Sequence, residues 1–235
     1  MNSIKYSGDA VLDIISLHAP NRNRSIEKLI VKYLKLDDID KRISILEFGA
    51  GKGEFIRRFI SRKNLELFAV EIDTSYLKKL SSMVKVFNSV DEISVKMDCI
   101  YLIDVLEHLE NDQFYLNQFY DRLKVGGRLF IYVPARMELY SAFDKKIGHF
   151  RRYTLKELRA KTMAAGFTIE EIRYHEFLGY GASWINKLIG NNGELISSAV
   201  KLYDKFVVPF TNFIEKFIPA PIGKSIYLSA IRKEK

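Results

Sequence analysis

The stretch Ile45-Leu46-Glu47-Phe48-Gly49-Ala50-Gly51-Lys52-Gly53-Glu54-Phe55 decides the fold of this chain. The apolar, β-branched run that ends before Glu47 is typical of a strand covered on both faces of a sheet. Three glycines at alternate positions follow, and glycine lets the backbone take a positive φ and lets a ligand approach closely. Residues Glu54 to Ser61 have the composition of a helix. The stretch therefore predicts a strand, a turn and a helix, which is where an open α/β sheet binds its ligand.

The charges around this turn separate two classes of ligand. A dinucleotide site follows the pattern G-x-G-x-x-G and places a pyrophosphate on the helix N-terminus. Here Glu54 occupies the place of the third glycine, and Glu47 precedes the turn. These carboxylates disfavour a phosphate and favour a ligand with an ammonium or sulfonium group. The alternative is a glycine turn in an ordinary α/β domain that binds nothing there.

The pattern E-x-G-x-G-x-G resembles the first motif of class I S-adenosylmethionine-dependent methyltransferases. That family implies an α/β, Rossmann-like fold with a mostly parallel seven-stranded sheet, an antiparallel last strand and helices on both faces. We expect a helical insertion before the last strand. The resemblance implies S-adenosylmethionine as cofactor, with its methionine part held by Glu47, Phe48, Gly49, Ala50, Gly51 and Gly53.

Acidic and amide residues follow the next two predicted strands. Glu71 lies near the end of a strand over Glu66–Ile72, about 20 positions past the glycines, where an acid accepts hydrogen bonds from ribose hydroxyls. Asp73 is the alternative for this role, although we expect Asp73 to cap the helix that follows. The resemblance adds two further cofactor contacts, Ile72 and, after a short third strand, Asn88.

A second motif begins at the end of the predicted fourth strand, Met97 to Asp104. The run D-V-L-E-H-L that starts at Asp104 resembles the fourth motif of the same methyltransferases. It implies that Asp104 and Val105 lie beside the cofactor, with His108 nearby as a catalytic base. The alternative for His108 is a buried imidazole that holds the loop by hydrogen bonds.

The pattern continues through a turn over Lys124–Gly127, with a glycine that ends the preceding helix, and a strand over Arg128–Val133. Because strands alternate with helices, we expect a parallel sheet with right-handed crossovers.

The run Gly148-His149-x-Arg151-Arg152-Tyr153-Thr154 follows the fifth strand. It resembles a subgroup of methyltransferases that modifies small molecules, sugars and isoprenoid-type substrates. His149 is the candidate base, since imidazole titrates near neutral pH. Arg151, Arg152 and Tyr153 are candidate substrate residues, because paired arginines bind carboxylate or phosphate. In the alternative, the arginines bind backbone carbonyls and acidic side chains to fix the loop.

We expect no metal site, because the four histidines are scattered along the chain at His18, His108, His149 and His175.

We expect one methyltransferase domain over residues 1–235, made of a helical cover (1–40), a cofactor-binding core (41–178), a helical insertion (179–224) and a last strand (225–235). In the cover, Ala19 to Arg24 should interrupt the helices, and Ser25 should cap a helix over Ile26–Leu36. Asn21 to Arg24 would then be either a loop that contacts substrate or a solvated connection.

In the insertion, aromatic and apolar residues recur at helical spacing from Ala199 to Ile218, with Pro209 as a break or kink. Three interpretations of this stripe stay open. The stripe packs on the body as core, or it forms a homodimer seam or a lid over an apolar substrate. In the third, residues 199–218 make a peripheral membrane contact, with lysines at the interface.

The composition sets outer bounds on function. A net charge of +8 permits an anionic partner, but no basic run or RNA-binding motif accompanies it, and nucleic acid is disfavoured as a substrate. One cysteine, no membrane-length apolar run and no signal-peptide pattern predict a cytoplasmic protein.

We therefore expect methyl transfer to an oxygen or nitrogen of a small-molecule acceptor, such as a sugar, a glycolipid or another secondary or envelope metabolite. The alternatives are a non-catalytic methyltransferase-like binding or partner module and a protein methyltransferase.

Overall fold

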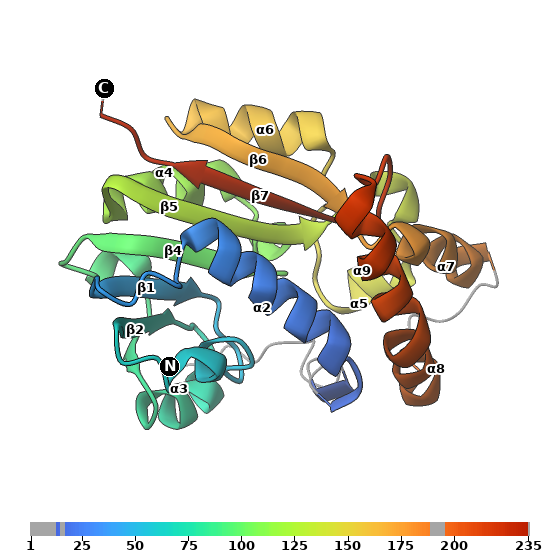
Figure 1. The fold of residues 1–235 in the computed structure, drawn as a ribbon, viewed down its shortest axis with the longest axis horizontal. Coiled ribbons are helices and arrows are strands. Elements are labelled where there is room, and N and C mark those ends of the chain that lie inside the picture. The colour runs from blue at the N-terminus through green and yellow to red at the C-terminus, as the bar shows by residue number, and fades with distance from the viewer. Residues whose placement is uncertain (1–12, 15–16, 189–195, 235) are drawn as a thin grey trace.

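The computed structural model describes residues 13–14, 17–188 and 196–234 of the 235-residue chain. In this part, one seven-stranded sheet has the order β3-β2-β1-β4-β5-β7-β6 (Figure 1). The strands are β1 (Ile43–Phe48), β2 (Leu65–Val70), β3 (Lys85–Phe87), β4 (Met97–Ile103), β5 (Leu123–Pro134), β6 (Thr168–His175) and β7 (Ser225–Ile231). Every neighbouring pair is parallel except the two that β7 makes, with β5 and β6. The predicted fold class is confirmed.

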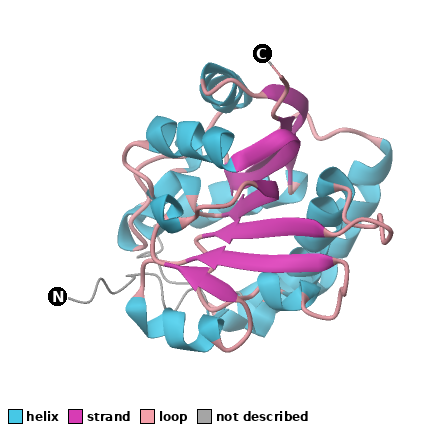
Figure 2. Ribbon diagram, turned by 90° about the vertical axis from the view of Figure 1, so that its left-hand side faces the viewer, coloured by secondary structure: helices cyan, strands magenta, loops and turns pink. Residues whose placement is uncertain are grey.

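Helices and short helical turns connect these strands, and helices lie on both sides of the sheet (Figure 2). The α-helices are α2 (Pro20–Leu34), α3 (Thr74–Ser81), α4 (Asp112–Arg122), α5 (Ala142–Lys146), α6 (Leu155–Ala164), α7 (Phe177–Leu188), α8 (Ser197–Leu202) and α9 (Val208–Phe217). The short turns are the 3₁₀ elements η1 (Ile56–Phe59), η2 (Val90–Glu92), η3 (Leu106–His108) and η4 (Met137–Leu139), and the π-helical η5 (Tyr203–Val207).

Alternate residues of each central strand feed two separate cores, as the period-2 geometry of a strand requires. Ile45 and Tyr101 pack with the apolar side of α2 on one face. Leu46 and Ile100 pack with α4 and α6 on the other. Because both faces are covered, the central strands read as nearly continuous apolar runs.

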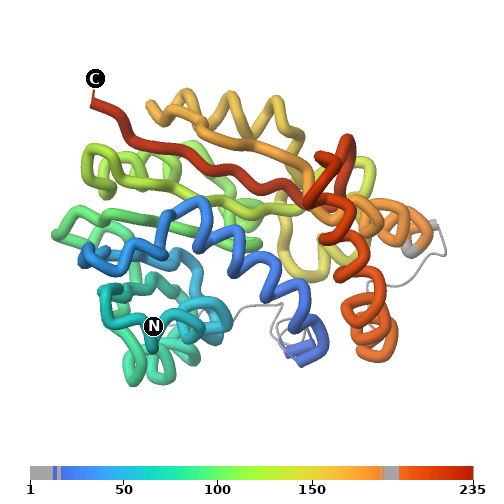
Figure 3. The backbone as a smooth tube through the Cα atoms, viewed as in Figure 1, coloured from blue at the N-terminus to red at the C-terminus, as the bar shows by residue number. Residues whose placement is uncertain are grey.

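The parallel crossovers bring the carboxyl ends of β1, β2, β4 and β5 to one edge of the sheet. Helices α7, α8 and α9 lie beyond this edge, and α2 crosses the face of the sheet to meet α9 (Figures 1 and 3). The insertion therefore lies next to the carboxyl ends of these strands. The predicted cover over 1–40 contains α2, whereas residues 1–12 and 15–16 lie outside the described part.

The segment after the glycine turn differs from the expected helix. Only the 3₁₀ element η1 forms, and Ile56 and Phe59 are buried by it as their spacing suggested. The backbone N–H of Arg58 donates to the carbonyl of Phe55, three residues earlier, which is the 3₁₀ pattern and not that of an α-helix. The polar side of the turn is fixed by ion pairs from Arg57 and Arg58 to Glu54.

The start of α2 also corrects the sequence prediction. The helix begins at Pro20, so the expected interruption over Ala19–Arg24 is wrong and Ser25 lies inside the helix. Proline suits the first helical position. The carboxylate of Asp204, in η5, accepts hydrogen bonds from the backbone N–H groups of Asn21 (2.9 Å) and Arg22 (2.8 Å). A cap supplied from so far along the chain cannot be recognised from local sequence.

The turn before β5 is a third difference. Helix α4 ends at Arg122, and its C-cap is the extended Leu123, which already pairs with β4. Gly126 has φ of +80° and belongs to the extended segment, where its N–H donates to the carbonyl of Arg232. This long-range pairing takes the place of the predicted glycine cap.

Within its described residues the insertion is helical, beginning at Phe177. The interpretation of its stripe as core is wrong, because Phe206, Phe210, Phe213 and Phe217 are each 57–66% exposed. Pro209 does not break the helix. It follows a π-helical turn and stands at the start of α9, where its missing N–H costs little. Among the described residues, no helix combines the length and the apolar character needed to cross a bilayer.

Candidate active site

A cavity of about 1070 Å³ opens between the carboxyl edge of the sheet and the insertion. It brings together most of the residues singled out from the sequence. Those that line it are Glu47, Phe48, Gly49, Ala50, Gly51, Glu71, Ile72, Asp104, Val105, His108, His149 and Arg152. Gly53, Asn88, Arg151 and Tyr153 are not part of this lining.

The glycine loop forms one wall of the cavity, and glycine is required at each of its three positions for a different reason. Gly49 has φ of +74°, and a Cβ there would lie 2.6 Å from the side chain of Val105. Gly51, with φ of +52°, donates its N–H to the Glu71 carboxylate at 2.6 Å. Gly53 has φ of +78°, and a Cβ would press on Leu80 of α3 at 3.0 Å. The third glycine therefore serves packing against α3.

Glu47 lies at the end of β1, buried beneath the loop. Burial raises the pKa of its carboxyl group to about 8, although the hydroxyl of Tyr101 donates to it at 3.0 Å. The nearby carboxylates of Glu71 and Glu54 reinforce this increase. A ligand ammonium would offset the cost of ionising Glu47.

The carboxylate of Glu71 links the loop to the end of β2. One oxygen accepts from the Gly51 N–H, and the other accepts from the backbone N–H of Asp73 at 2.8 Å. Asp73 caps α3 through Ser75, as predicted. Asn88 follows β3 outside the cavity lining, and its backbone N–H donates to Glu92. Its predicted contact with the cofactor stays a prediction.

Arg22, whose side chain is 12% exposed, lies in the cavity wall, and the sequence indicated it only as part of the segment Asn21–Arg24. The guanidinium of Arg22 binds the Asp104 carboxylate at 2.8 Å, lies 3.6 Å from the Glu176 carboxylate, and stacks over the ring of Tyr132. Asp104 and Glu176 each follow a strand end and adopt positive φ values, +53° and +60°. Non-glycine residues in this conformation carry strain, which is frequent at functional sites.

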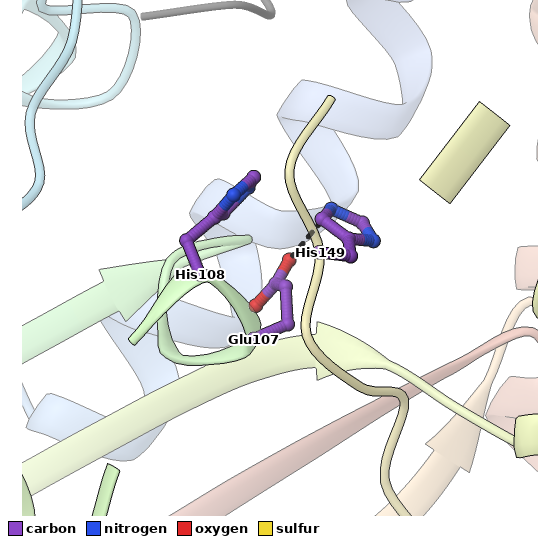
Figure 4. Close-up of side chains that lie close together, drawn as sticks. All are labelled: Glu107, His108 and His149. Atoms are coloured by element: carbon purple, nitrogen blue, oxygen red, sulfur yellow. Dashed lines mark ion pairs between the residues drawn. The ribbon is translucent and has the colours of Figure 1, made fainter. Parts of the chain in front are cut away.

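The two central histidines, far apart in sequence, lie together. The rings of His108 and His149 are 4.5 Å apart between centroids, in an edge-to-face arrangement. Although the histidines are scattered along the chain, the fold brings this pair together, and Glu107 joins them (Figure 4). Burial, followed by the charge of Asp104, raises the pKa of Glu107 well above its usual value. Burial and the neighbouring His149 lower the pKa of His108 to about 4.

A buried carboxylate orients His149. Its Nδ1 lies 2.8 Å from Asp144, and Arg152 binds the same carboxylate through Nε at 2.8 Å and through its terminal nitrogen at 3.1 Å. Burial alone would raise the pKa of Asp144, but these hydrogen bonds hold it at about 2. Asp144 was within the polar run after the fifth strand, and nothing in its local sequence distinguished it from a solvated residue.

Arg151 and Tyr153 fix the loop that carries His149. Both bind the carboxylate of Asp112 at 2.8 Å, and Arg151 also donates to the carbonyl of Glu110. Tyr153 is fully buried and pairs with Ala135 as an isolated bridge. These contacts favour the alternative in which the arginine pair holds the loop. The predicted roles of Arg151 and Tyr153 in substrate binding have no support from their positions.

The fold and the cavity define the class of S-adenosylmethionine-dependent methyltransferases. Comparison with known proteins agrees: a family model described as a methyltransferase domain matches residues 18–172, and the chain belongs to that family. No curated protein sequence matches the chain significantly.

Solved methyltransferase structures share the fold at low sequence identity. A coclaurine N-methyltransferase bound to N-methylheliamine and S-adenosylhomocysteine is 15% identical, with a TM-score of 0.60 over 88% of this chain and 71% of that one. An S-adenosylmethionine-dependent methyltransferase from Archaeoglobus fulgidus is 14% identical, with a TM-score of 0.56 over 89% of this chain and 94% of that one.

The residues present fit S-adenosylmethionine. At Gly49 a Cβ would clash with the side chain of Val105, so glycine lets the loop pack closely against the end of β4, and both residues line the cavity. Buried Glu47 suits the ammonium group, and the carboxylate of Glu71 suits a diol. These positions agree with the cofactor end that the motif implied.

Proposed function

We propose that this enzyme transfers a methyl group from S-adenosylmethionine to an oxygen or nitrogen of a small amphipathic molecule. The observation that carries the proposal is the cavity, with the glycine loop at one end and apolar side chains of the insertion at the other. Its volume of about 1070 Å³ exceeds the roughly 300–1,000 Å³ of a typical ligand pocket. The cavity therefore suits a cofactor and an acceptor side by side.

At the cofactor end of the cavity, the role of the chain is to bind and orient the cofactor. When bound, S-adenosylmethionine supplies a methyl group already activated on a sulfonium sulfur. Glu47 and the backbone of Gly49–Gly51 would hold the amino-acid part, and Glu71 would hold the ribose. Asp104 and Val105, at the end of β4, would contribute to the wall beside the cofactor. The chain's contribution is alignment at near-attack distance and exclusion of water.

At the acceptor end, the wall is supplied by the insertion. Ala182 and Ile185 of α7, Ile196, and Ala199 and Val200 of α8 line the cavity. This lining favours an acceptor with an apolar body. His108 and His149 also line the cavity and are our candidates for contact with the reacting group of the acceptor.

The exposed stripe of α8, η5 and α9 supports an amphipathic acceptor independently. Phe206, Phe210, Phe213 and Phe217 face solvent, and Lys205 and Lys216 lie over neighbouring phenylalanine rings. Aromatic side chains beside lysines on one helix suit an anionic membrane surface, and the net charge of +8 is complementary to it. We propose that this stripe contacts such a surface and that the acceptor is drawn from it.

The proposed reaction is tested with S-adenosylmethionine carrying a tritiated methyl group, mixed with cell extract separated into lipid and aqueous fractions. We expect label in an organic-extractable product. Label confined to water-soluble small molecules would refute the amphipathic acceptor, and label on protein would favour the protein methyltransferase. Val200→Asp should reduce labelling without changing S-adenosylhomocysteine affinity. Ser198→Asp, on the same helix but outside the lining, is the matched control.

The membrane contact is tested by co-sedimentation with phosphatidylcholine vesicles that contain or lack phosphatidylglycerol. We expect binding only to the anionic vesicles and its loss in Phe210→Ser/Phe213→Ser. Val125→Ser is the control, since Val125 is equally apolar and exposed but belongs to β5. A stable dimer by light scattering that the double variant dissociates, without vesicle binding, would instead assign the stripe to a homodimer seam.

A further inference from the structure

Three side chains next to the acceptor end converge in a way that the methyl-transfer scheme leaves unexplained. Glu107, His108 and His149 each offer one electron-pair donor atom, and the three atoms lie within 4.8 Å of one another (Figure 4). The Nε2 atom of His149 and a carboxylate oxygen of Glu107 are 3.6 Å apart, which is longer than a hydrogen bond. They come from two separate loops, which follow β4 and β5.

The proton positions make these atoms donors of electron pairs. Asp144 is held as a carboxylate by Arg152, so it can only accept, and the proton of His149 is on Nδ1. The Nε2 atom of His149 therefore presents a lone pair toward Glu107. His108 offers one ring nitrogen to the same group of atoms.

The environment of Glu107 is a second, independent observation that points to a ligand. Its side chain is fully buried, and both carboxylate oxygens lack a hydrogen-bond partner. Buried carboxylates without partners are costly, and such groups are normally paired or coordinate metal ions. Among the described residues, no lysine or arginine forms an ion pair with Glu107 in this structure.

We propose that Glu107, His108 and His149 bind a divalent transition metal of the Zn²⁺ type. Bonds of about 2.0–2.2 Å to nitrogen and carboxylate oxygen place tetrahedral ligand atoms roughly 3.4 Å apart, close to the 3.6 Å between His149 and Glu107. Asp144 then acts as the second-shell carboxylate that orients a ligand histidine. Because His108 and His149 line the cavity, the ion has an entry path and an open coordination position toward the acceptor.

The role of this ion in the reaction rests on the proposed function, whereas the site itself does not. The ion binds a hydroxyl oxygen of the acceptor, and the O–H proton leaves to water. An oxygen lone pair then forms the bond to the methyl carbon, while the C–S electron pair returns to sulfur as a neutral thioether. A Lewis acid beside the nucleophile favours oxygen as the methylated atom.

The experiment uses untagged full-length protein stripped with EDTA. Zinc binding is measured by equilibrium dialysis, and Co²⁺ is added as a visible-absorption probe of ligand geometry. We expect one ion per chain in the wild type. Affinity should fall at least about 100-fold in Glu107→Gln and His108→Asn, and about 10–100-fold in the second-shell variant Asp144→Asn. Glu110→Gln, on the exposed end of the same loop, should bind like the wild type.

The results that would refute the metal site differ from those that would refute the proposed function. The inference is overturned if the folded wild-type protein binds no more zinc than Glu107→Gln, or if His108→Asn retains full affinity and the cobalt spectrum. S-adenosylhomocysteine affinity is measured in parallel on the stripped protein. Cofactor binding without metal binding refutes only the metal site. Failure of the folded protein to bind the cofactor refutes the proposed function.

Discussion

The ionisation of Glu47 provides the sharpest test of the cofactor site. The carboxyl group is buried beneath the glycine loop, and its pKa is raised to about 8. At neutral pH it is therefore mostly protonated in the cofactor-free protein. The α-ammonium group of the ligand favours the carboxylate, so binding should release a proton from Glu47.

The size of the effect follows from the pKa. Below pH 8, each pH unit adds about 1.4 kcal/mol to the cost of ionising Glu47. If the bound carboxylate stays ionised, affinity should fall about 50-fold between pH 8, where half of the free carboxyl groups are ionised, and pH 6. Glu47→Gln should bind weakly at both pH values, with little slope. Glu54→Gln removes another carboxylate of the same loop, one paired with Arg58, and should keep the slope.

The same group predicts a pH dependence of stability. Its folded pKa lies above its unfolded value, so the stability contributed by the bound proton is complete below about pH 4.5 and is lost as the pH rises toward 8. Cofactor-free wild-type protein should therefore lose more stability than Glu47→Gln over this window in urea titrations.

Calorimetry with S-adenosylhomocysteine, which keeps the ammonium group without the sulfonium charge, measures the affinity and the protons released. Repeating each titration in buffers of different ionisation enthalpy counts those protons. We expect close to one proton at pH 7 for the wild type and none for Glu47→Gln. Equal affinities at pH 6 and pH 8, or the wild-type slope in Glu47→Gln, would refute the assignment of Glu47 to the ammonium group.

Three further predictions concern single contacts. Glu71→Ala should weaken cofactor binding by ~1–3 kcal/mol in a calorimetric titration, since a charge-assisted hydrogen bond is lost; unchanged affinity would move the ribose contact elsewhere. His149→Ala should lower turnover and leave cofactor affinity unchanged, whereas an equal effect on both would make His149 structural. Asp204→Ala should destabilise the protein by about 1–2 kcal/mol in urea unfolding, because α2 loses its cap, while exposed Asp121→Ala should not.

The sheet and the cofactor end were predictable because they depend on local patterns. Buried parallel strands give apolar runs, and the turn after β1 needs glycine at Gly49 for a reason visible in one chain segment, its positive φ. The position of Glu71 at the end of β2 could be predicted from its distance in sequence to the glycines, which is the length of one βα unit. The residues Glu47, Glu71 and Asp104 could therefore be placed at one edge before any coordinates were known.

The acceptor end was less predictable, since it is assembled from distant segments. Asp204 caps α2 from the insertion, and Asp144 orients His149 only after a loop has folded back on itself. The sequence alone does not distinguish an aspartate that is buried in the folded protein from one that is exposed to solvent. The exposure of Phe213 could not be predicted either. Helical spacing shows that apolar residues share one face of a helix, but it does not show whether another part of the protein covers that face.

Arg22 connects the cofactor end of the cavity to the acceptor end. Its guanidinium joins Asp104 after β4 to Glu176 after β6, and its backbone N–H is bound by Asp204 of the insertion. Both acidic partners of the guanidinium keep strained left-handed conformations, which persist only where surrounding contacts enforce them. Lys224 completes the charge balance, with its ammonium 3.3 Å from Glu176. A movement of the insertion would therefore disturb Asp104, so the apolar wall of the insertion and the end of β4 are coupled through the guanidinium of Arg22.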